Sequence, residues 1–183
     1  EKDIEKLVKE LIDTFLSAGE ISINLRIKGL TKKIKSDSTP VSNGDLEINK
    51  IITEKIKELT PSIPIISEET SDNKSITNLE NFWLIDPIDG TYDYINNLNE
   101  FTINAGLIKN RRPIAGLICA PAKKRMFYSY GKDNAYELIN GKEIKINGSK
   151  NFDQNNIRFV SYSAKIKPEI KKIFDKLNVK EHT

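Results

Sequence analysis

The chain has 183 residues, carries 29 Lys and Arg against 26 Asp and Glu, and is 38% apolar. This length fits one domain, or one domain with the beginning of another. A net charge of +3, spread over mixed Lys and Glu positions, argues against a nucleic-acid polymer as a partner. One Cys and one His exclude disulfides, zinc clusters and Cys–His or Ser–His–Asp catalysis. Any catalysis must therefore depend on carboxylates.

The sequence gives no sign of a membrane segment or of a reactive thiol. No apolar run approaches the ~18 residues that span a bilayer, and the N-terminus lacks the apolar stretch of a signal peptide. We therefore expect no membrane partner and a cytoplasmic location. Cys119 lies in an apolar run, which favours a core position over a nucleophilic one.

Two amphipathic helices are predicted in the first 60 residues. Apolar residues at helical spacing predict a helix over residues 2 to 18 that ends at Gly19. Residues 28 to 44 are polar and contain Pro and Gly, which is typical of a mobile loop. A second helix is predicted over residues 46 to 59, and Pro61 ends it.

Beyond the second helix the apolar pattern changes to short runs separated by turn residues. These runs predict strands at residues 63–67, 82–85, 101–108, 114–120, 126–130 and 135–139. Asn140-Gly141 is the strongest hairpin signal in the chain, because both central residues of a type I′ turn need positive φ. Consecutive strands after two helices therefore predict an α+β fold, with helices layered on a largely antiparallel sheet.

The last 31 residues are predicted to begin a second domain. Residues 151 to 156 are polar, a further strand is predicted at 158–161, and Pro168 opens an amphipathic helix. We expect an N-terminal α+β domain at residues 1–152 and an incomplete C-terminal α/β domain at residues 153–183.

An apolar strand ends in the most informative segment, which contains two acids three residues apart. Asp86 and Asp89 can face one side of a turn there, and two carboxylates at a strand end suit a hard cation. The Ile88 carbonyl can add a neutral oxygen. The amides of Gly90 and Thr91 can hold an anion where a helix begins. Taken alone, the segment is equally compatible with a simple turn in which Asp86 caps a helix.

Two other segments also end in acids. The strand at residues 63–67 is followed by Glu68 and Glu69, and Asp45 opens the second helix. Each acid alone has an ordinary interpretation, as a solvated strand end or as a helix cap. Three such segments together favour a shared site.

In these three segments the sequence resembles the magnesium-dependent phosphatases related to inositol monophosphatase. The family signature has a Pro-Val-Ser/Thr-x-x-Asp loop, a strand ending in Glu-Glu, and Trp-x-x-Asp-Pro-x-Asp-Gly-Thr. All three occur here in order, at residues 40–45, 67–69 and 83–91. The resemblance covers residues 4 to 180 and implies a layered fold of the sugar-phosphatase type.

Within that family the sequence is most similar to the 3′(2′),5′-bisphosphate nucleotidase branch. Residues 35–42 resemble its loop, residues 99–104 resemble its Gly-Glu-Phe-Thr-Val-Asn strand, and residues 116–121 resemble its Gly-Val-x-x-Ala-Pro run. This implies hydrolysis of a small phosphorylated substrate, adenosine 3′,5′-bisphosphate in the first place, to AMP and phosphate. Inositol or sugar phosphates are the alternative substrates, and a homodimer is left open.

The resemblance also implies roles for individual residues, with two or three Mg²⁺ ions in the complete enzyme. The implied metal ligands are Glu68, Asp86, the Ile88 carbonyl and Asp89. The implied catalytic residues are Asp45, Thr91 and Glu68, with Asp45 hydrogen-bonded to Thr91 and accepting a proton from water. Gly90 and Thr91 are implied to bind the substrate phosphate.

Two departures from the family pattern limit these expectations. The family draws a further metal ligand from a Trp-Asp-x-x-Ala-Gly motif, whereas the only Trp here is Trp83. We therefore expect these residues to form an N-terminal portion of the family fold. The nucleotidase branch also tends to have Arg where residues 161–163 read Ser-Tyr-Ser, so substrate contacts at that edge are not implied.

Two other functions remain open. A phosphatase of the haloacid-dehalogenase type also places Asp and Thr after an apolar strand, but its acids are spaced Asp-x-Asp. A non-catalytic module that binds a metal or a phosphoester is the alternative from a different class.

Overall fold

The computed structural model describes residues 2–34, 40–69, 79–148, 157–160, 166–177 and 179–182. The chain divides into two compact units, Glu1–Asn147 and Gly148–Thr183. Three parts of the sequence predictions lie outside the described residues: the loop motif at 35–39, the expected domain boundary at 152 and 153, and the Ser-Tyr-Ser segment at 161–163.

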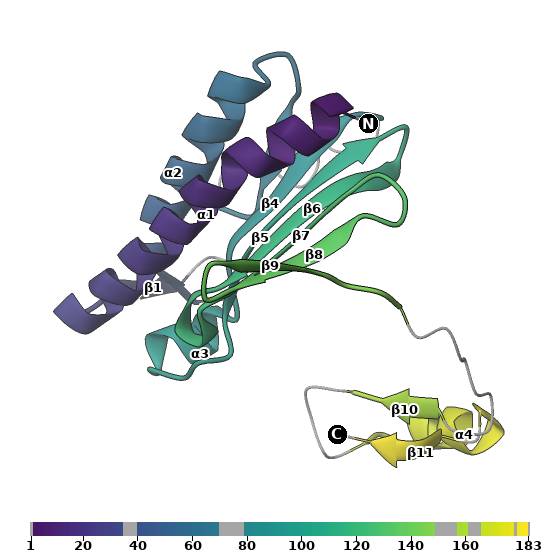
Figure 1. The fold of residues 1–183 in the computed structure, drawn as a ribbon. Helices are drawn as coiled ribbons and strands as arrows, with labels where there is room; N and C mark the ends of the chain where they lie inside the picture. The colour runs from purple at the N-terminus through teal and green to yellow at the C-terminus, as the bar shows by residue number, and fades with distance from the viewer. Residues whose placement is uncertain are drawn as a thin grey trace. The chain divides into compact units, whose positions relative to one another are not determined.

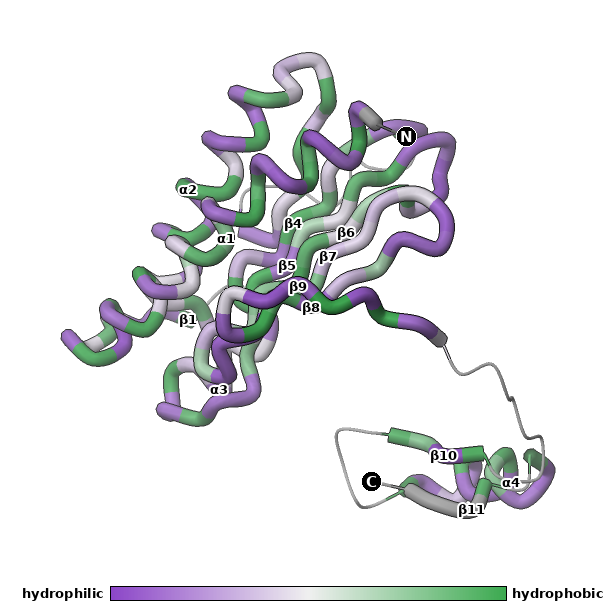
Figure 2. Tube along the Cα trace, viewed as in Figure 1, coloured by the Kyte–Doolittle hydropathy of each residue, from purple (hydrophilic) through white to green (hydrophobic). Residues whose placement is uncertain are grey.

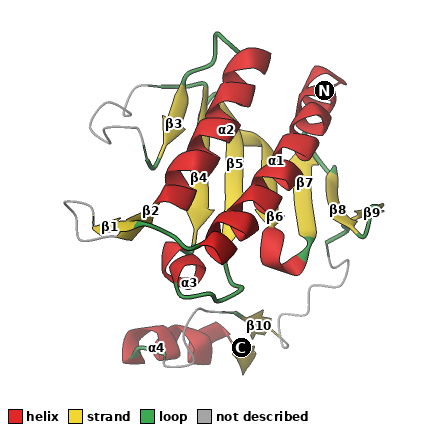
Figure 3. Cartoon of the chain, turned by 90° about the vertical axis from the view of Figure 1, so that its left-hand side faces the viewer, coloured by secondary structure: helices red, strands yellow, loops and turns green. Residues whose placement is uncertain are grey.

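In the first unit, two helices cover one face of a seven-stranded sheet (Figures 1 and 3). The helices are α1 (Lys2–Lys28) and α2 (Asn43–Leu59). The strands, in spatial order, are β3 (Ile65–Ser67), β4 (Phe82–Asp89), β5 (Thr102–Lys109), β6 (Arg112–Ala120), β7 (Arg125–Tyr130), β8 (Ala135–Ile139) and β9 (Lys142–Lys145). This arrangement confirms the predicted α+β layered class.

The sheet is antiparallel except at one edge. β3 pairs in parallel with β4, and every later neighbour pairs antiparallel. The predicted hairpin joins β8 to β9, where Asn140 and Gly141 have φ values of 51° and 72°. Both values are positive, as a type I′ turn requires.

The first helix is longer than the sequence predicted. It continues through Gly19 and ends only before Gly29, whose φ is 99°. A Cβ atom on Gly19 would lie 3.2 Å from both Cys119 Sγ and Pro121 Cγ. Gly19 therefore marks a close approach between helix and sheet, and the prediction that it ends the helix was wrong. Burial raises the pKa of the Cys119 thiol to about 12, which fits its predicted core position.

The predicted loop at residues 28 to 44 contains regular structure. β1 (Lys32–Ile34) and β2 (Pro40–Ser42) form a short antiparallel pair, and α2 begins directly after them. The Ser42 hydroxyl accepts from the amides of Gly44 and Asp45, and the Asp45 carboxylate accepts from the Ser42 amide. This capping box explains why α2 begins three residues earlier than predicted.

The core lies between the two helices and the sheet. Apolar residues (green in Figure 2) recur along α1, α2 and the central strands, and the fully buried side chains include Phe15, Ile52 and Trp83. The Trp83 indole N–H donates to Thr60 Oγ1 at 3.0 Å, which ties the beginning of β4 to the end of α2.

The second unit is small. β10 (Ile157–Phe159) pairs in parallel with β11 (Val179–His182), and α4 (Pro168–Leu177) lies between them in sequence. The rings of Phe159 and Phe174 lie 4.5 Å apart, centroid to centroid. The helix beginning at Pro168 was predicted, but β11 was not. Across the described parts of both units, no helix has the length and apolar character needed to cross a membrane.

Gly44 offers a test of how α2 is held. A Cβ atom at this position would lie 2.5 Å from the Tyr94 hydroxyl oxygen, which donates to the Ser22 carbonyl at 2.7 Å. Because Tyr94 is fully buried, we expect Gly44→Ala to destabilise the fold by about 1–3 kcal/mol, the usual range for overpacking. Thermal and denaturant unfolding would measure this. Gly148→Ala is the control, because no described atom lies within 4 Å of a Cβ there.

Candidate active site

The parallel edge of the sheet places two of the predicted acids side by side. Ser67 lies opposite Ile85 in the register of β3 and β4. One step further, the Glu68 amide donates to the Ile85 carbonyl at 3.2 Å. Because the carboxyl ends of parallel strands meet at one edge, Glu68 and Asp86 are neighbours.

A bulge in β4 brings the third acid to the same face. Asp86 pairs with Asn104, and Asp89 pairs with Thr102, so three steps along β4 match two steps along β5. In a regular strand, residues three apart point to opposite faces. The extra residue corrects this, and Asp86 and Asp89 both lie on the face that carries Thr102 and Asn104. The bulge also accommodates Pro87, which has no amide proton for the ladder.

The chain then turns at Gly90 into the five-residue helix α3 (Thr91–Ile95). Gly90 has a φ of 86°, and a Cβ atom there would lie 2.7 Å from the Glu100 carbonyl oxygen. Positive φ and the close backbone both require glycine. The turn therefore places Thr91 beside the end of β4.

Asp45 and Thr91 form the contact that we expected. The Thr91 hydroxyl lies 3.0 Å from Asp45 Oδ1 and 3.0 Å from the Ile88 carbonyl oxygen. The other Asp45 oxygen accepts from the amide and the hydroxyl of Ser42 at 2.8 and 2.6 Å. With only 1% of Asp45 exposed, its carboxylate is fixed toward Thr91. Asp45 therefore uses Oδ1 for the predicted contact with Thr91 and Oδ2 to cap the helix through Ser42.

Burial and neighbouring charge act together on Asp86. Burial contributes most, followed by the charges of Glu68 and Asp89, and together they raise the pKa of the Asp86 carboxyl to about 7. A hydrogen bond with Glu68 and the charge of Asp45 act in the same direction. Carboxylates this close are stable together only if one carries a proton or a cation lies between them.

The donor set fits a hard divalent cation. Asp86 Oδ1 is buried and has no hydrogen-bond partner among the described residues. All the candidate ligand atoms are oxygens, which Mg²⁺ and Ca²⁺ prefer. Within the described ranges, no group of three or more His, Cys, Asp or Glu side chains closes around one position.

The structure thus brings the expected residues to one end of β4. Glu68 and Asp86 are adjacent, Asp89 shares their sheet edge, and Asp45 and the Ile88 carbonyl meet at Thr91. Their assignment as metal ligands, catalytic groups and phosphate ligands stays a prediction.

Polar residues support these acids, and no role was predicted for them, although Ser67 and Asn104 fall within the motifs at residues 67–69 and 99–104. Ser67, 1% exposed, donates to Asn49 Oδ1 at 2.5 Å, and this pair joins α2 to the strand end before Glu68. Asn104 Nδ2 donates to Asp89 Oδ2 at 3.4 Å. Asn49 lies one helical turn after Asp45, which was the only available signal for the first pair.

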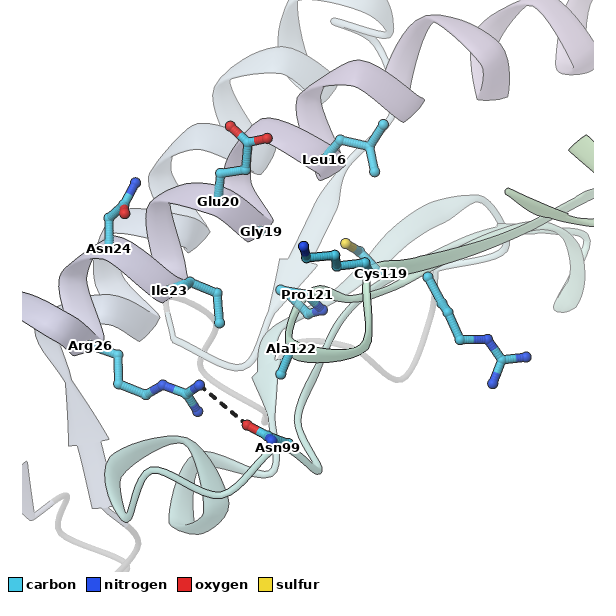
Figure 4. A pocket seen from close by; sticks show the side chains of 12 residues that line it. Leu16, Gly19, Glu20, Ile23, Asn24, Arg26, Asn99, Cys119, Pro121 and Ala122 are labelled. Carbon is cyan, nitrogen blue, oxygen red and sulfur yellow. Dashed lines mark hydrogen bonds between the residues drawn. The ribbon is translucent and has the colours of Figure 1, made fainter. Parts of the chain in front are cut away.

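A cavity of about 710 Å³ lies elsewhere, between α1 and the turn that follows β6 (Figure 4). None of the expected site residues lines it. Its two guanidinium groups have partners, because Arg26 donates to the Leu98 carbonyl at 2.6 Å and Arg125 pairs with Glu137 at 2.6 Å. We therefore place the chemistry at the end of β4 and not in this cavity.

The fold is a layered α+β domain whose parallel sheet edge gathers carboxylate and carbonyl oxygens. Residues 3–182 match the model of the inositol monophosphatase family. The chain belongs to that family.

Individual proteins agree with this assignment. The chain is 32% identical over 173 residues to the 3′(2′),5′-bisphosphate nucleotidase CysQ of Aggregatibacter actinomycetemcomitans, covering 93% of this chain and 64% of that protein. It is 38% identical over 146 residues to the enzyme of the same name from Buchnera aphidicola, covering 78% of this chain and 55% of that protein. The chain thus spans less than two thirds of the length of either relative.

Solved structures share the fold. The structure of an IMPase/NADP phosphatase complexed with Mg²⁺ and phosphate matches with a TM-score of 0.76, at 19% identity, over 97% of this chain and 66% of that one.

The raised pKa of Asp86 predicts how pH affects the metal-free protein. In the unfolded protein the Asp86 carboxyl ionises at about pH 4, whereas in the folded protein it holds its proton to about pH 7. The folded state therefore binds more protons between these values, and its stability falls as pH rises through them. Asp86→Asn should remove this decrease and also the stabilisation by Mg²⁺. Thermal unfolding from pH 4 to 8, with chelator or Mg²⁺, would measure both effects.

The exposed Asp13→Asn on α1 is the matched control, because it removes a carboxylate far along the chain from β4. It should leave the response to Mg²⁺ unchanged. Equal Mg²⁺ shifts in Asp86→Asn and the parent chain would contradict the assignment of Asp86.

Proposed function

We propose that the protein containing these residues is a Mg²⁺-dependent phosphomonoesterase, and that its substrate is adenosine 3′,5′-bisphosphate. The observation that carries this proposal is the Thr91 hydroxyl, which lies 3.0 Å from both the Asp45 carboxylate and the Ile88 carbonyl, directly after Asp86 and Asp89 on β4. The names of the two relatives described above support the substrate.

Glu68, Asp86 and the Ile88 carbonyl would hold one ion, while Asp86 and Asp89 would hold a second. Bound Mg²⁺ would lower the pKa of the attacking water and neutralise charge on the phosphoryl oxygens. Asp86 is common to both ligand sets, and its buried, unpartnered oxygen supports that role. With two or three ions in the complete enzyme, further ligands would come from water, substrate or other residues.

Thr91 and Asp45 would accept the proton of the attacking water. The Thr91 hydroxyl has one proton, and the Asp45 carboxylate is the stronger of its two acceptors because it carries charge. Donation to Asp45 leaves a lone pair on Thr91 Oγ1 that can accept a hydrogen bond from water. Asp45 is held by Ser42 and cannot turn away, so the proton has a defined path.

The substrate phosphate would bind where β4 turns into α3. The Gly90 and Thr91 amides lie at this turn, and amide donors there can orient a phosphate for in-line attack. Glu68, which neighbours Asp86, would serve both cation binding and catalysis. We also propose a cytoplasmic location, in keeping with a small phosphorylated substrate.

Family membership leaves the haloacid-dehalogenase alternative without support, because that class has a different fold and forms an aspartyl phosphate. Inositol phosphates remain the second candidate substrate, since the chain shares its fold with proteins named IMPase. A substrate panel with adenosine 3′,5′-bisphosphate and inositol monophosphates, scored by phosphate release with and without Mg²⁺, would decide between them. Loss of turnover in a folded Asp89→Asn variant would separate an enzyme from a binding module.

Thr91→Ala tests the proton path. In the complete protein, we expect kcat to fall by about 10² to 10⁴, the range typical of general acid–base groups, with nearly unchanged Mg²⁺ affinity. Steady-state kinetics with a Mg²⁺ titration would measure both quantities. Thr91→Ser retains the hydroxyl and should keep most of the activity. Full kcat in the alanine variant would reject the role of Thr91.

A further inference from the structure

Asn104 faces the two acids of β4 from the neighbouring strand. It lies directly opposite Asp86 in the register of β4 and β5, and its side chain is on the same face as Asp86 and Asp89. Asn104 Nδ2 donates to Asp89 Oδ2 at 3.4 Å. A neutral side chain thus stands among the carboxylates.

The orientation of the Asn104 amide follows from its neighbours. If its nitrogen and oxygen were exchanged, the amide oxygen would face the Asp89 carboxylate, and two acceptors would repel each other. The nitrogen therefore belongs toward Asp89. The oxygen is left for another partner.

Among the described residues, no donor lies within hydrogen-bond distance of that oxygen. Asn104 Oδ1 and Asp86 Oδ1 are the two buried side-chain polar atoms that lack a hydrogen bond among the described residues. They belong to residues that face each other across β4 and β5. When Asp86 is ionised, both atoms are acceptors without a donor, and they then call for a positive charge or a donor from outside the chain. Native proteins rarely leave such atoms unpaired without a functional reason.

We propose that Asn104 is a positioning residue of the cation site. Its amide N–H fixes the orientation of Asp89, and its carbonyl oxygen adds a neutral acceptor beside Asp86. A neutral residue here supplies oxygen without adding a further negative charge to Glu68, Asp86 and Asp89. This inference rests on the proposed Mg²⁺-dependent function and names a residue that the motifs did not assign to it.

The test compares Asn104→Leu with Asn81→Leu in the full chain. Leucine is close to asparagine in shape and removes both polar groups. Asn81 precedes the opposite end of β4, where its Oδ1 accepts from the Asn110 amide at 3.0 Å. We expect Asn104→Leu to weaken Mg²⁺ binding by about 10- to 100-fold, the usual effect of losing a residue that supports metal ligands. Asn81→Leu should bind Mg²⁺ as the parent does. Isothermal titration calorimetry with Mg²⁺ would measure both.

Stability separates this role from a structural one. Asn104→Leu removes an unpaired buried oxygen, which favours the folded state, and a long hydrogen bond to Asp89, whose loss disfavours it, so the melting temperature of the metal-free protein should change little. Asn104→Ser keeps a group that can donate and accept, and should weaken Mg²⁺ binding less than leucine does. This variant also serves if Asn104→Leu does not fold.

The outcomes distinguish the two proposals. If the parent chain binds Mg²⁺ and the Asn104 variants bind it equally well, the role of Asn104 is overturned and the proposed function stands. A lower melting temperature with unchanged Mg²⁺ affinity would likewise make Asn104 merely structural. If the parent chain itself shows no Mg²⁺ binding, the proposed function fails, and the role of Asn104 fails with it.

Discussion

The candidate site depends on one extra residue in β4. Without the bulge between Asp86 and Asp89, the strand would point one of these carboxylates into the apolar layer under α1 and α2, where an unpaired charge is very costly. With it, both acids share a face, Pro87 fits in a central strand, and the chain reaches Gly90 in the geometry that begins α3. The positions of Thr91 and of the Ile88 carbonyl follow from the same irregularity.

The site works against the stability of the fold that carries it. Glu68, Asp86 and Asp89 repel one another, and burial raises the free energy of the charged form of Asp86. Hydrogen bonds of the neighbouring residues offset part of this destabilisation. Asp45 is held by the capping box of α2, and Ser67 and Asn49 satisfy each other below the strand end. Local strain and repulsion supported by a rigid scaffold are typical of functional sites.

Much of the fold could be predicted from sequence, because hydrophobic spacing and turn chemistry act locally. The Asn140-Gly141 hairpin and the second helix were predicted on that basis. The extension of α1 past Gly19 was not, since the glycine serves a close contact with Cys119 and Pro121, which are 100 residues or more away in sequence, and does not end the helix. The acids of the site stood out through their motifs. Asn104 ends the motif at residues 99–104, but its place beside Asp86 could not be predicted, because it is fixed by strand register, which spacing along one strand cannot give.

Two hydrogen bonds, one near each end of β4, also restrict the lengths of β4 and α2. Trp83 near the start of β4 is tied to Thr60 at the end of α2, and Thr91 just past its end is tied to Asp45 near the beginning of the same helix. Helix and strand therefore run in opposite directions between two fixed points. The 15 steps from Asp45 to Thr60 span about 22 Å at 1.5 Å per helical residue, and the eight steps from Trp83 to Thr91 span at most about 26 Å at 3.3 Å each. One inserted residue would lengthen the strand by about twice as much as the helix. A change in the length of either element would separate Asp45 from Thr91. Tolerated insertions should therefore fall in the connections outside the two hydrogen-bonded pairs.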